Sequence, residues 1–445
     1  MESKQLLNSL QANIIRPNAR QHNLCVFLQF EAEATAGHLK DLTVRRLPIT
    51  TAQKQQEYSD LRKQNRETNN DYVSETISCF FLSHKGLDSL DLDYSFITND
   101  FFSDGMANRV PTTNETPAYE WEQPYQADIH AMFLFASDSE RDLRAMHQKL
   151  RDALSDLPIN ELFHELGNRM YNEQGRVIEH FGFVDGITNP PILDEEKKIN
   201  FELLKGSFLV QENTGAWGSL FVYKKYWQNI DFFDQQIEEL SEKLNISKAF
   251  AEAQVFGRYK DGMPLLISDD PNATEQFKDQ IAQFDQGEMD YSQDKAGLRC
   301  PFHAHIRKSN PRKDDMVASY FGDKAFSQEI IRRGITYDYD HLNKGLLFMS
   351  YQSSISSQFE SILTEWCSNT DFPAAGVGTD PVIGTPPWSE RESPQRLWLK
   401  SWGEASGVAD PAELSFHFKP VVRLEGGEYF YAPSITYLEQ MDGEV

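Results

Sequence analysis

Met132-Phe-Leu-Phe-Ala136 is a short apolar run that indicates a buried strand. The next four residues, Ser137-Asp-Ser-Glu140, have the pattern of a helix capping box. Apolar residues then recur at helical spacing, at Leu143, Met146, Leu150 and Leu154. The segment therefore predicts a strand, a short polar break and an amphipathic helix.

The same order returns late in the chain. Leu346-Leu-Phe-Met-Ser-Tyr351 predicts an apolar strand, and a serine-rich break follows it. One face of a helix is then marked by Ile355, Phe359, Ile362, Leu363 and Trp366. Two copies of one strand–break–helix unit, at similar places in the two halves, predict a duplicated α+β unit.

Other segments complete this outline. Residues 24–31 and 72–83 predict strands, a hairpin is expected around residues 206–222, and a helical region from about 228 to 257. Residues 95–123 and 372–394 are rich in loop-forming residues, and loops of that length are often functional or form interfaces. A charged break at residues 194–198 places the domain boundary near residues 195–205.

Composition limits the classes of function. The chain has 445 residues, enough for two domains, and its net charge of −25 argues against a nucleic-acid partner. No apolar run approaches the length of a membrane span, and the N-terminus lacks the pattern of a secretory signal. The four cysteines are scattered without metal-finger spacing, which favours a reduced, cytoplasmic protein.

Two histidines and several cations are concentrated in Cys300-Pro-Phe-His-Ala-His-Ile-Arg-Lys-Ser-Asn-Pro-Arg312. On a strand, His303 and His305 would point to the same face. They could then bind a non-haem metal together, or one of them could ligate a haem iron. Arg307 and Arg312 favour haem, because its two propionates require cations.

A carboxylate and an arginine pair stand out elsewhere. Asp185 lies in the glycine-flanked turn Gly182-Phe-Val-Asp-Gly186, among apolar neighbours. A carboxylate in such surroundings must be paired, hydrated or functional. Arg332 and Arg333 follow two isoleucines, and a buried guanidinium there would need a carboxylate or an anionic ligand.

Taken in order, these segments resemble those of dye-decolourising peroxidases. Gly182-Phe-Val-Asp-Gly186 is similar to the GxxDG signature of that family. Ala304-His-Ile-Arg307 with Asn310-Pro-Arg312 is similar to its proximal histidine motif, and Ile331-Arg-Arg-Gly-Ile335 to the segment that supplies its distal arginine. Supporting matches run along most of the chain, and the long insertions resemble the larger, intracellular bacterial branch.

The resemblance implies an α+β fold class with two ferredoxin-like domains, whose antiparallel sheets are flanked by helices. Residues 1–200 are expected to form an N-terminal domain carrying the GxxDG turn, and residues 201–445 a C-terminal haem-binding domain. One haem b is expected in a cavity lined mainly by the second domain.

The resemblance also implies roles for single residues. His305 is the expected axial ligand of the iron, whereas His303 is not expected to ligate. Asp185 is the expected distal acid–base residue and Arg332 the expected distal arginine, with Arg333 as the competing assignment. Residues expected to contact the cofactor are His305, Arg307, Arg312, Arg333 and Phe348.

Two details are left to the structure. The carboxylate that orients the proximal imidazole is not assigned, and Glu425 and Glu428 are the candidates. Thr336-Tyr-Asp338 departs from the Pro-Tyr-Gly of many relatives, which affects the expected peroxide channel.

The expected function is a haem-dependent peroxidase that reduces hydrogen peroxide and oxidises dyes and phenolic compounds in one-electron steps. Bulky reductants cannot enter a small haem pocket, so electrons are expected to arrive through surface Trp or Tyr residues. Trp366, Trp388, Trp398 and Trp402 gather near the C-terminus, although core packing is the favoured explanation for each of them. The alternatives are a non-haem metalloenzyme using His303 and His305, and a haem-binding or haem-delivery protein with incidental peroxidase activity.

Overall fold

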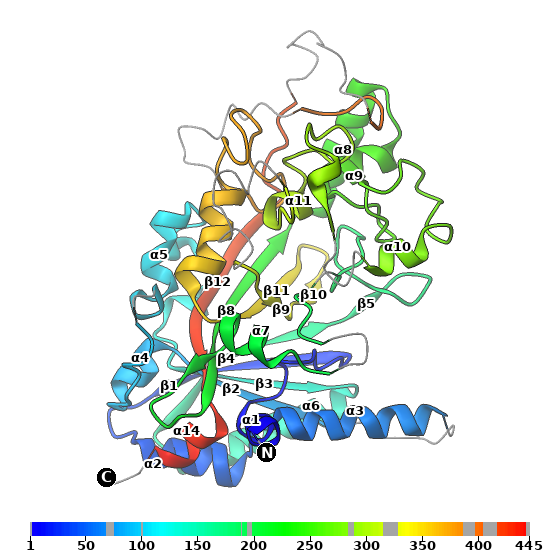
Figure 1. Ribbon diagram of the computed structural model, residues 1–445. Coiled ribbons are helices and arrows are strands. Elements are labelled where there is room, and N and C mark those ends of the chain that lie inside the picture. The colour runs from blue at the N-terminus through cyan, green and yellow to red at the C-terminus, as the bar shows by residue number, and fades with distance from the viewer. Residues whose placement is uncertain are drawn as a thin grey trace.

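The structure is a computed structural model that describes residues 2–67, 75–98, 101–187, 189–193, 198–283, 289–314, 328–385, 397–403 and 416–441. Its centre is a ten-stranded antiparallel sheet with the path β10-β11-β8-β12-β2-β3-β1-β4 (Figure 1). Two short strands, β7 and β9, pair with β8 and β11 beside this path. No helix in the described part of the chain is long and apolar enough to cross a bilayer.

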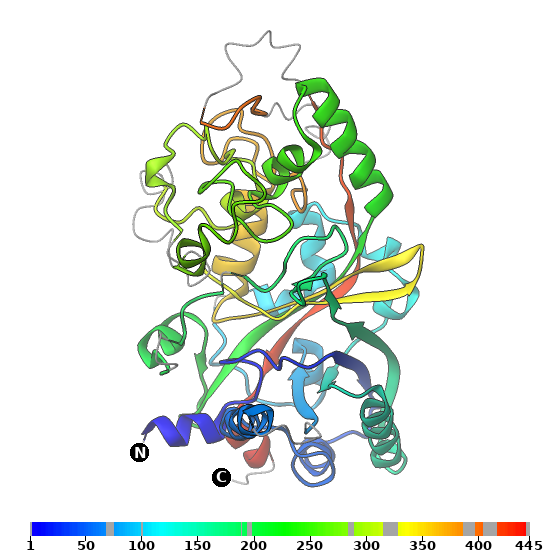
Figure 2. The ribbon, with the colours of Figure 1, turned by 90° about the vertical axis from the view of Figure 1, so that its right-hand side faces the viewer.

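The N-terminal half of the sheet has the order β2-β3-β1-β4. Its strands are β1 (His22–Phe30), β2 (Ile77–Leu82), β3 (Ala131–Ser137) and β4 (Ile159–Asn168). Helix α3 (Ala52–Glu67) lies between β1 and β2 in the chain, and α6 (Glu140–Leu154) between β3 and β4. Both helices cover the face of the sheet that is turned away from the C-terminal half (Figure 2).

The C-terminal half repeats this arrangement with β8 (Trp217–Gln228), β10 (Ile335–Asp340), β11 (Asn343–Gln352) and β12 (Val422–Ala432). Its order β10-β11-β8-β12 corresponds strand for strand to β2-β3-β1-β4. Helices α8 (Ile230–Leu244) and α9 (Lys248–Phe256) follow its first strand. The helix made of η8 (Ile355–Glu360) and η9 (Ile362–Cys367) follows its third. The predicted fold class, α+β with two ferredoxin-like units, is confirmed.

The duplicated strand–break–helix unit falls at equivalent positions, because β3 with α6 corresponds to β11 with η8–η9. One detail of the prediction was wrong. Ser139, and not Ser137, caps α6, and it accepts a hydrogen bond from the Asp142 backbone N–H. Ser354 caps η8 in the same way, by accepting from Ser357. A serine therefore begins the helix in both units.

The two halves meet at β12 and β2, where Tyr431 pairs with Leu82. The side chains at this junction are aromatic, and Phe81 stacks on Phe221 with ring centroids 4.2 Å apart. The joined sheet and its buried apolar side chains form one core that runs through both halves.

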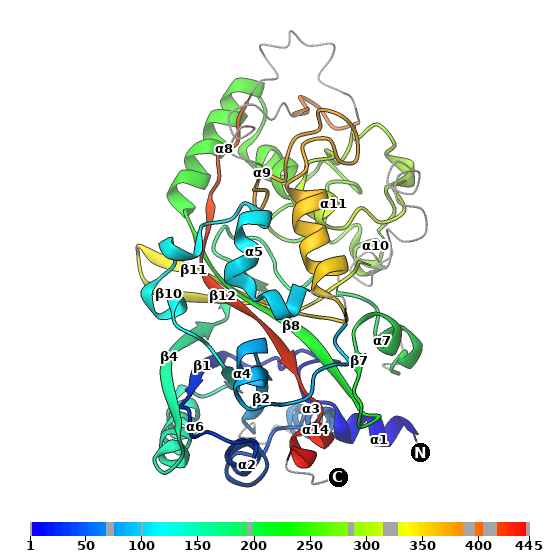
Figure 3. The same ribbon diagram turned by 90° about the vertical axis from the view of Figure 1, so that its left-hand side faces the viewer.

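The long loop predicted over residues 95–123 contains helices in its described part. They are η2 (Phe101–Asp104), α5 (Met106–Thr113) and η3 (Ala118–Glu120). Helix α5 buries Met106 and Val110 and lies beside η8–η9 over β8 and β12 (Figure 3). A segment of the N-terminal half thus covers the sheet of the C-terminal half.

The remaining elements are shorter. The predicted hairpin at residues 206–222 consists of β7 (Val210–Gln211) and β8, while Gly206 belongs to helix α7 (Phe201–Ser207). The other short strands are β5 (Met170–Tyr171), β6 (Val177–Ile178) and β9 (Ile331–Arg332). Further helices are α1 (Glu2–Ser9), α2 (Ala36–Lys40), η1 (Asp41–Arg46), α4 (His84–Ser89), η4 (Gln123–Gln126), α10 (Lys278–Gln283), η6 (Tyr291–Gln293), α11 (His305–Ser309) and α14 (Ile435–Gln440).

Candidate active site

A cavity of about 260 Å³ lies in the C-terminal half. Its walls are largely apolar side chains from β11 and η8–η9, including Leu346, Phe348, Phe359, Leu363 and Trp366. Charged and polar groups enter it from other segments. They include Glu179, Asp185, His305, Arg312 and Arg332. An apolar cavity with a few convergent ionisable groups is the usual form of an active or binding site.

His305 is the first residue of helix α11. The sequence had instead suggested that it lies on a strand. Its Nδ1 lies 2.8 Å from Oδ2 of Asp380, a fully buried carboxylate. The carboxylate holds the proton on Nδ1, so that Nε2 keeps its lone pair available to a metal. Burial raises the pKa of Asp380, but His305 and the N–H groups of Val382 and Ile383 outweigh burial and lower this pKa overall.

The prediction that Glu425 or Glu428 orients the His305 imidazole is wrong. Glu425 pairs with Arg423 at 2.7 Å, and Glu428 accepts the backbone N–H of Met106 at 3.0 Å. Asp380 was missed because it lies 75 residues beyond His305 in the chain. The one sequence signal that could have indicated it is its position in the Gly- and Pro-rich segment 372–394.

His303 does not join His305 at the cavity. Its ring lies 4.4 Å from that of Trp398, and both side chains are buried. His303 is also not among the described residues that line the cavity. A two-histidine, non-haem metal centre is therefore not the arrangement that the structure contains.

The Asp185 turn is built by its glycines and by a second carboxylate. Gly182 and Gly186 have φ of +92° and +76°, a region that favours glycine. Glu179 accepts the backbone N–H groups of Phe181 at 2.9 Å and Phe183 at 3.1 Å. Glu179 also lines the cavity, and burial, the largest effect, raises its pKa to about 7. Glu179 was not predicted from the sequence, where its only signal was its position six residues before Asp185.

The two arginines point in different directions. Arg332 lines the cavity, and its Nη2 donates to the Ile187 carbonyl at 2.5 Å. Burial lowers the pKa of Arg332, and the charge of Asp185 opposes this shift. Arg333 instead donates to the carbonyls of Asn13 and Ile14 at 2.7 and 2.8 Å. The structure thus brings Arg332, and not Arg333, to the cavity.

Arg307 and Arg312 also differ in position. Arg307 is buried away from the cavity and pairs with Asp294 at 2.9 Å and Asp314 at 2.7 Å. Arg312 lines the cavity and pairs with Glu329 at 2.5 Å. Its Nε and Nη1 are buried without a hydrogen-bond partner. Buried N–H donors need acceptors, so these two nitrogens are suited to an anionic group placed in the cavity.

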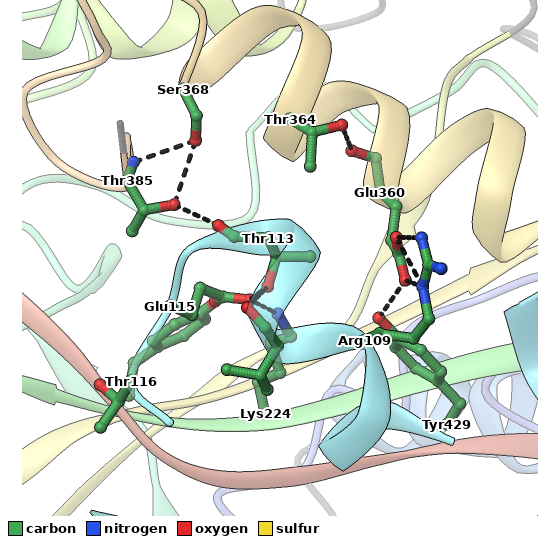
Figure 4. A network of polar contacts seen from close by, with 12 residues as sticks. Arg109, Thr113, Glu115, Thr116, Lys224, Glu360, Thr364, Ser368, Thr385 and Tyr429 are labelled. Carbon is green, nitrogen blue, oxygen red and sulfur yellow. Dashed lines mark hydrogen bonds and ion pairs between the residues drawn. The ribbon is translucent and has the colours of Figure 1, made fainter. Parts of the chain in front are cut away.

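The insertion that carries α5 forms a network of polar contacts with β8 and η8 (Figure 4). Tyr226 lines the cavity, and its hydroxyl donates to Glu115 Oε1 at 2.9 Å. The other oxygen of Glu115 binds the Lys224 ammonium at 2.5 Å, and both charged groups are buried. Arg109 on α5 pairs with the buried Glu360 of η8 at 2.8 Å. Buried, mutually paired charges fix geometry, so this network holds β8 and η8 in place.

Two family models match the chain in succession. The model described as DyP dimeric alpha+beta barrel domain matches residues 9–177, and the one described as Dyp-type peroxidase, C-terminal, matches residues 177–372. The structure of a DyP-type peroxidase from Anabaena sp. is 30% identical, with a TM-score of 0.83, and covers 98% of this chain and 95% of that one. The multifunctional dye peroxidase DyP2 of Amycolatopsis sp. is 27% identical over 99% of this chain and 97% of its own.

The cavity also fits a haem. Nε2 of His305 is available to the iron, Arg312 offers two unpaired donors to a propionate, and the walls are apolar. The chain therefore belongs to the dye-decolourising peroxidase family, and it is a haem b peroxidase that reduces hydrogen peroxide and oxidises dyes.

Proposed function

We propose that His305 holds the iron of haem b through Nε2, and that Asp185 and Arg332 act on hydrogen peroxide in the same cavity. The observation that carries this proposal is that residues 185, 305 and 332 line one cavity although they are far apart in the chain. When bound, the haem supplies the iron at which peroxide is reduced and holds the oxidising equivalents that dyes later consume. A protein that only carries haem has no need of an acid–base residue beside a buried cation.

Asp185 is the proposed acid–base residue. Its carboxylate takes a proton from one peroxide oxygen and returns it to the oxygen that leaves as water. A positioned group of this kind typically contributes ~10²–10⁴ in rate. Asp185 Oδ1 accepts the Gly186 N–H at 2.6 Å, which limits the orientations of the carboxylate.

Arg332 is the proposed source of positive charge near the O–O bond as it breaks. A preorganised cation or donor in a site that excludes water is worth roughly 10²–10³ in rate. Two residues of the Asp185 segment hold Arg332, because Asn189 accepts its backbone N–H at 2.9 Å and Ile187 its guanidinium. Asp185 and Arg332 are therefore positioned by one segment.

The remaining proposed roles concern the cofactor. Asp380 orients His305 so that Nε2 is the nitrogen offered to the iron, Arg312 binds a propionate, and Phe348 contributes to the cavity wall. Arg307 and Arg333 are not included, because neither lines the cavity. Their ion pairs and carbonyl bonds support structural roles instead.

We further propose phenols as reductants beside dyes, and a reducing, cytoplasmic location. Four free, buried cysteines support the location. We also propose a division of the chain into residues 1–200 and 201–445, which the two equivalent strand orders support.

Asp185→Asn and Arg332→Leu test this proposal, with Asp340→Asn at the exposed end of β10 as the matched control. Each variant should bind haem with a native absorption spectrum. Rapid mixing with peroxide should then show a spectral change slowed at least ~100-fold in both active-site variants and unchanged in the control. Unchanged rates in both would remove Asp185 and Arg332 from the mechanism.

A further inference from the structure

A second cluster of ionisable residues lies far from the cavity in the fold, on the α6 face of the N-terminal sheet. Glu161 Oε1 is 2.9 Å from His147 Nε2 and 3.1 Å from His164 Nδ1. The three ligand atoms all lie within 4.8 Å of one another. No residue of this cluster takes part in the function proposed above.

A bulge in β4 brings Glu161 and His164 to one face. Residues three apart on a regular strand point to opposite faces. Here Phe27 pairs with Phe163 but Leu28 with Glu161, so the strand carries one extra residue, Leu162. In β1, Val26 and Leu28 are two residues apart and point to the same face. Glu161 pairs with Leu28 and His164 pairs with Val26, so Glu161 and His164 also share that face. Bulges commonly re-aim a side chain at functional sites.

Helix α6 supplies the third group to this face. His147 is on the side of α6 that packs over the sheet, and its side chain is 12% exposed. The two imidazole rings are 4.7 Å apart. A hollow of about 130 Å³ adjoins both, lined by His147 and His164 together with Leu143 and Leu166. A ligand bound between the rings would thus have room for a water molecule beside it.

We propose that His147, Glu161 and His164 form a binding site for one divalent transition-metal ion of the class that prefers imidazole, with Zn²⁺ as its representative. Two imidazoles and one carboxylate are a frequent donor set for such ions, with a water in the fourth position. A tetrahedral ion with bonds of about 2.1 Å separates its ligand atoms by roughly 3.4 Å, close to the spacing found here. Without metal, both imidazoles can donate to Glu161, so the site is assembled in advance.

Arg151 sets the strength of this site. Its Nε donates to Glu161 Oε2 at 2.9 Å, and its Nη2 lies 3.3 Å from Oε1. The first bond holds the guanidinium directly beside the carboxylate that would bind the ion. The positive charge also opposes a bound cation, so removing it should strengthen binding.

The test is Zn²⁺ titration of the haem-loaded enzyme by calorimetry. The wild type should bind one Zn²⁺ at a saturable site, and His164→Ala should weaken that binding at least roughly tenfold. His164 is chosen because its side chain is 45% exposed, so that its loss leaves the core intact. His341→Ala removes an exposed histidine between β10 and β11 and serves as the matched control, with unchanged binding expected.

A second variant gives a result of opposite sign. Arg151→Gln should bind Zn²⁺ more tightly than the wild type, because it removes the positive charge beside the Glu161 carboxylate. Equal Zn²⁺ binding by the wild type and His164→Ala, or weaker binding by Arg151→Gln, would overturn the site.

Discussion

The two halves of the molecule share a strand order but bury their equivalent elements differently. Strand β3 is buried along its whole length, and α6 buries Leu143, Leu150 and Leu154 on the sheet side. The equivalent strand β11 leaves Leu346 and Phe348 partly exposed, because they border the cavity. The equivalent helix η8–η9 presents Phe359, Leu363 and Trp366 to the same cavity. One half thus uses the unit as a packed core, and the other uses it as the wall of a haem site.

The largest expected effect tests whether the cavity depends on His305. His305→Ala should lose haem or bind it weakly, because the iron loses its ligand. His303→Ala should keep the native spectrum, since His303 packs on Trp398 outside the cavity. Haem content and the absorption spectrum of both purified variants measure this. The opposite pattern would assign the iron to the wrong histidine.

A matched pair of phenylalanines tests the contrast directly. Phe135 on β3 is fully buried, so Phe135→Ala should lower the free energy of unfolding by about 3–5 kcal/mol. Phe348→Ala, on the equivalent strand, should cost less stability but weaken haem retention. Urea unfolding and haem transfer to an acceptor protein measure the two effects. Equal losses of stability would show that β11 is packed as tightly as β3.

Buried carboxylates sharpen the comparison. Glu165 in the N-terminal sheet pairs with Lys225 at 3.0 Å, whereas Glu179 at the cavity is held by neutral donors. The pKa of Glu179 is raised from 4.5 to about 7. Between these two pH values the native state therefore holds more protons than the unfolded state. Stability should therefore fall as pH rises from about 4.5 through 7, by at most roughly 3 kcal/mol. Glu179→Gln should flatten this slope in urea unfolding measured at several pH values.

The smallest expected effect concerns the surface field. With a net charge of −25, the protein repels anionic dyes and attracts cationic ones. At neutral pH, added salt should speed turnover of an anionic dye and slow that of a cationic dye, each by a few-fold. Steady-state rates across ionic strength test this, and a shared response of both dyes would contradict it.

Much of the fold was readable from local patterns. The apolar runs of β1, β3 and β11 and the periodicity of α6 and η8–η9 reflect burial, which sequence records directly. Helix α5 was missed because it contains Pro111 and many polar residues, and packing of Met106 and Val110 stabilises it. The spacing of His303 and His305 could not show whether their segment forms a strand or a helix. The buried ion pairs of Arg307 fix helix α11.

The site was readable only in part. Asp185, His305, Arg312 and Arg332 could be expected together because their motifs resemble those of a known family. Asp380 and Glu179 lacked a motif, and only the folded chain brings them to the site. Arg307 was expected at the haem because of its charge, yet two aspartates in its surroundings already neutralise it. Of the four tryptophans that gather near the C-terminus, Trp388 lies outside the described residues, and Trp366 lines the cavity.

The position of β12 has a consequence for how the protein folds and binds its cofactor. This strand is the last of the described strands along the chain, yet it lies between β8 and β2 and joins the two halves. Its first residue, Val422, also lines the haem cavity. A chain in which β12 has not yet docked therefore has an open edge along β8 and an incomplete cavity. A complete cavity is accordingly available to haem only after β12 has joined the sheet.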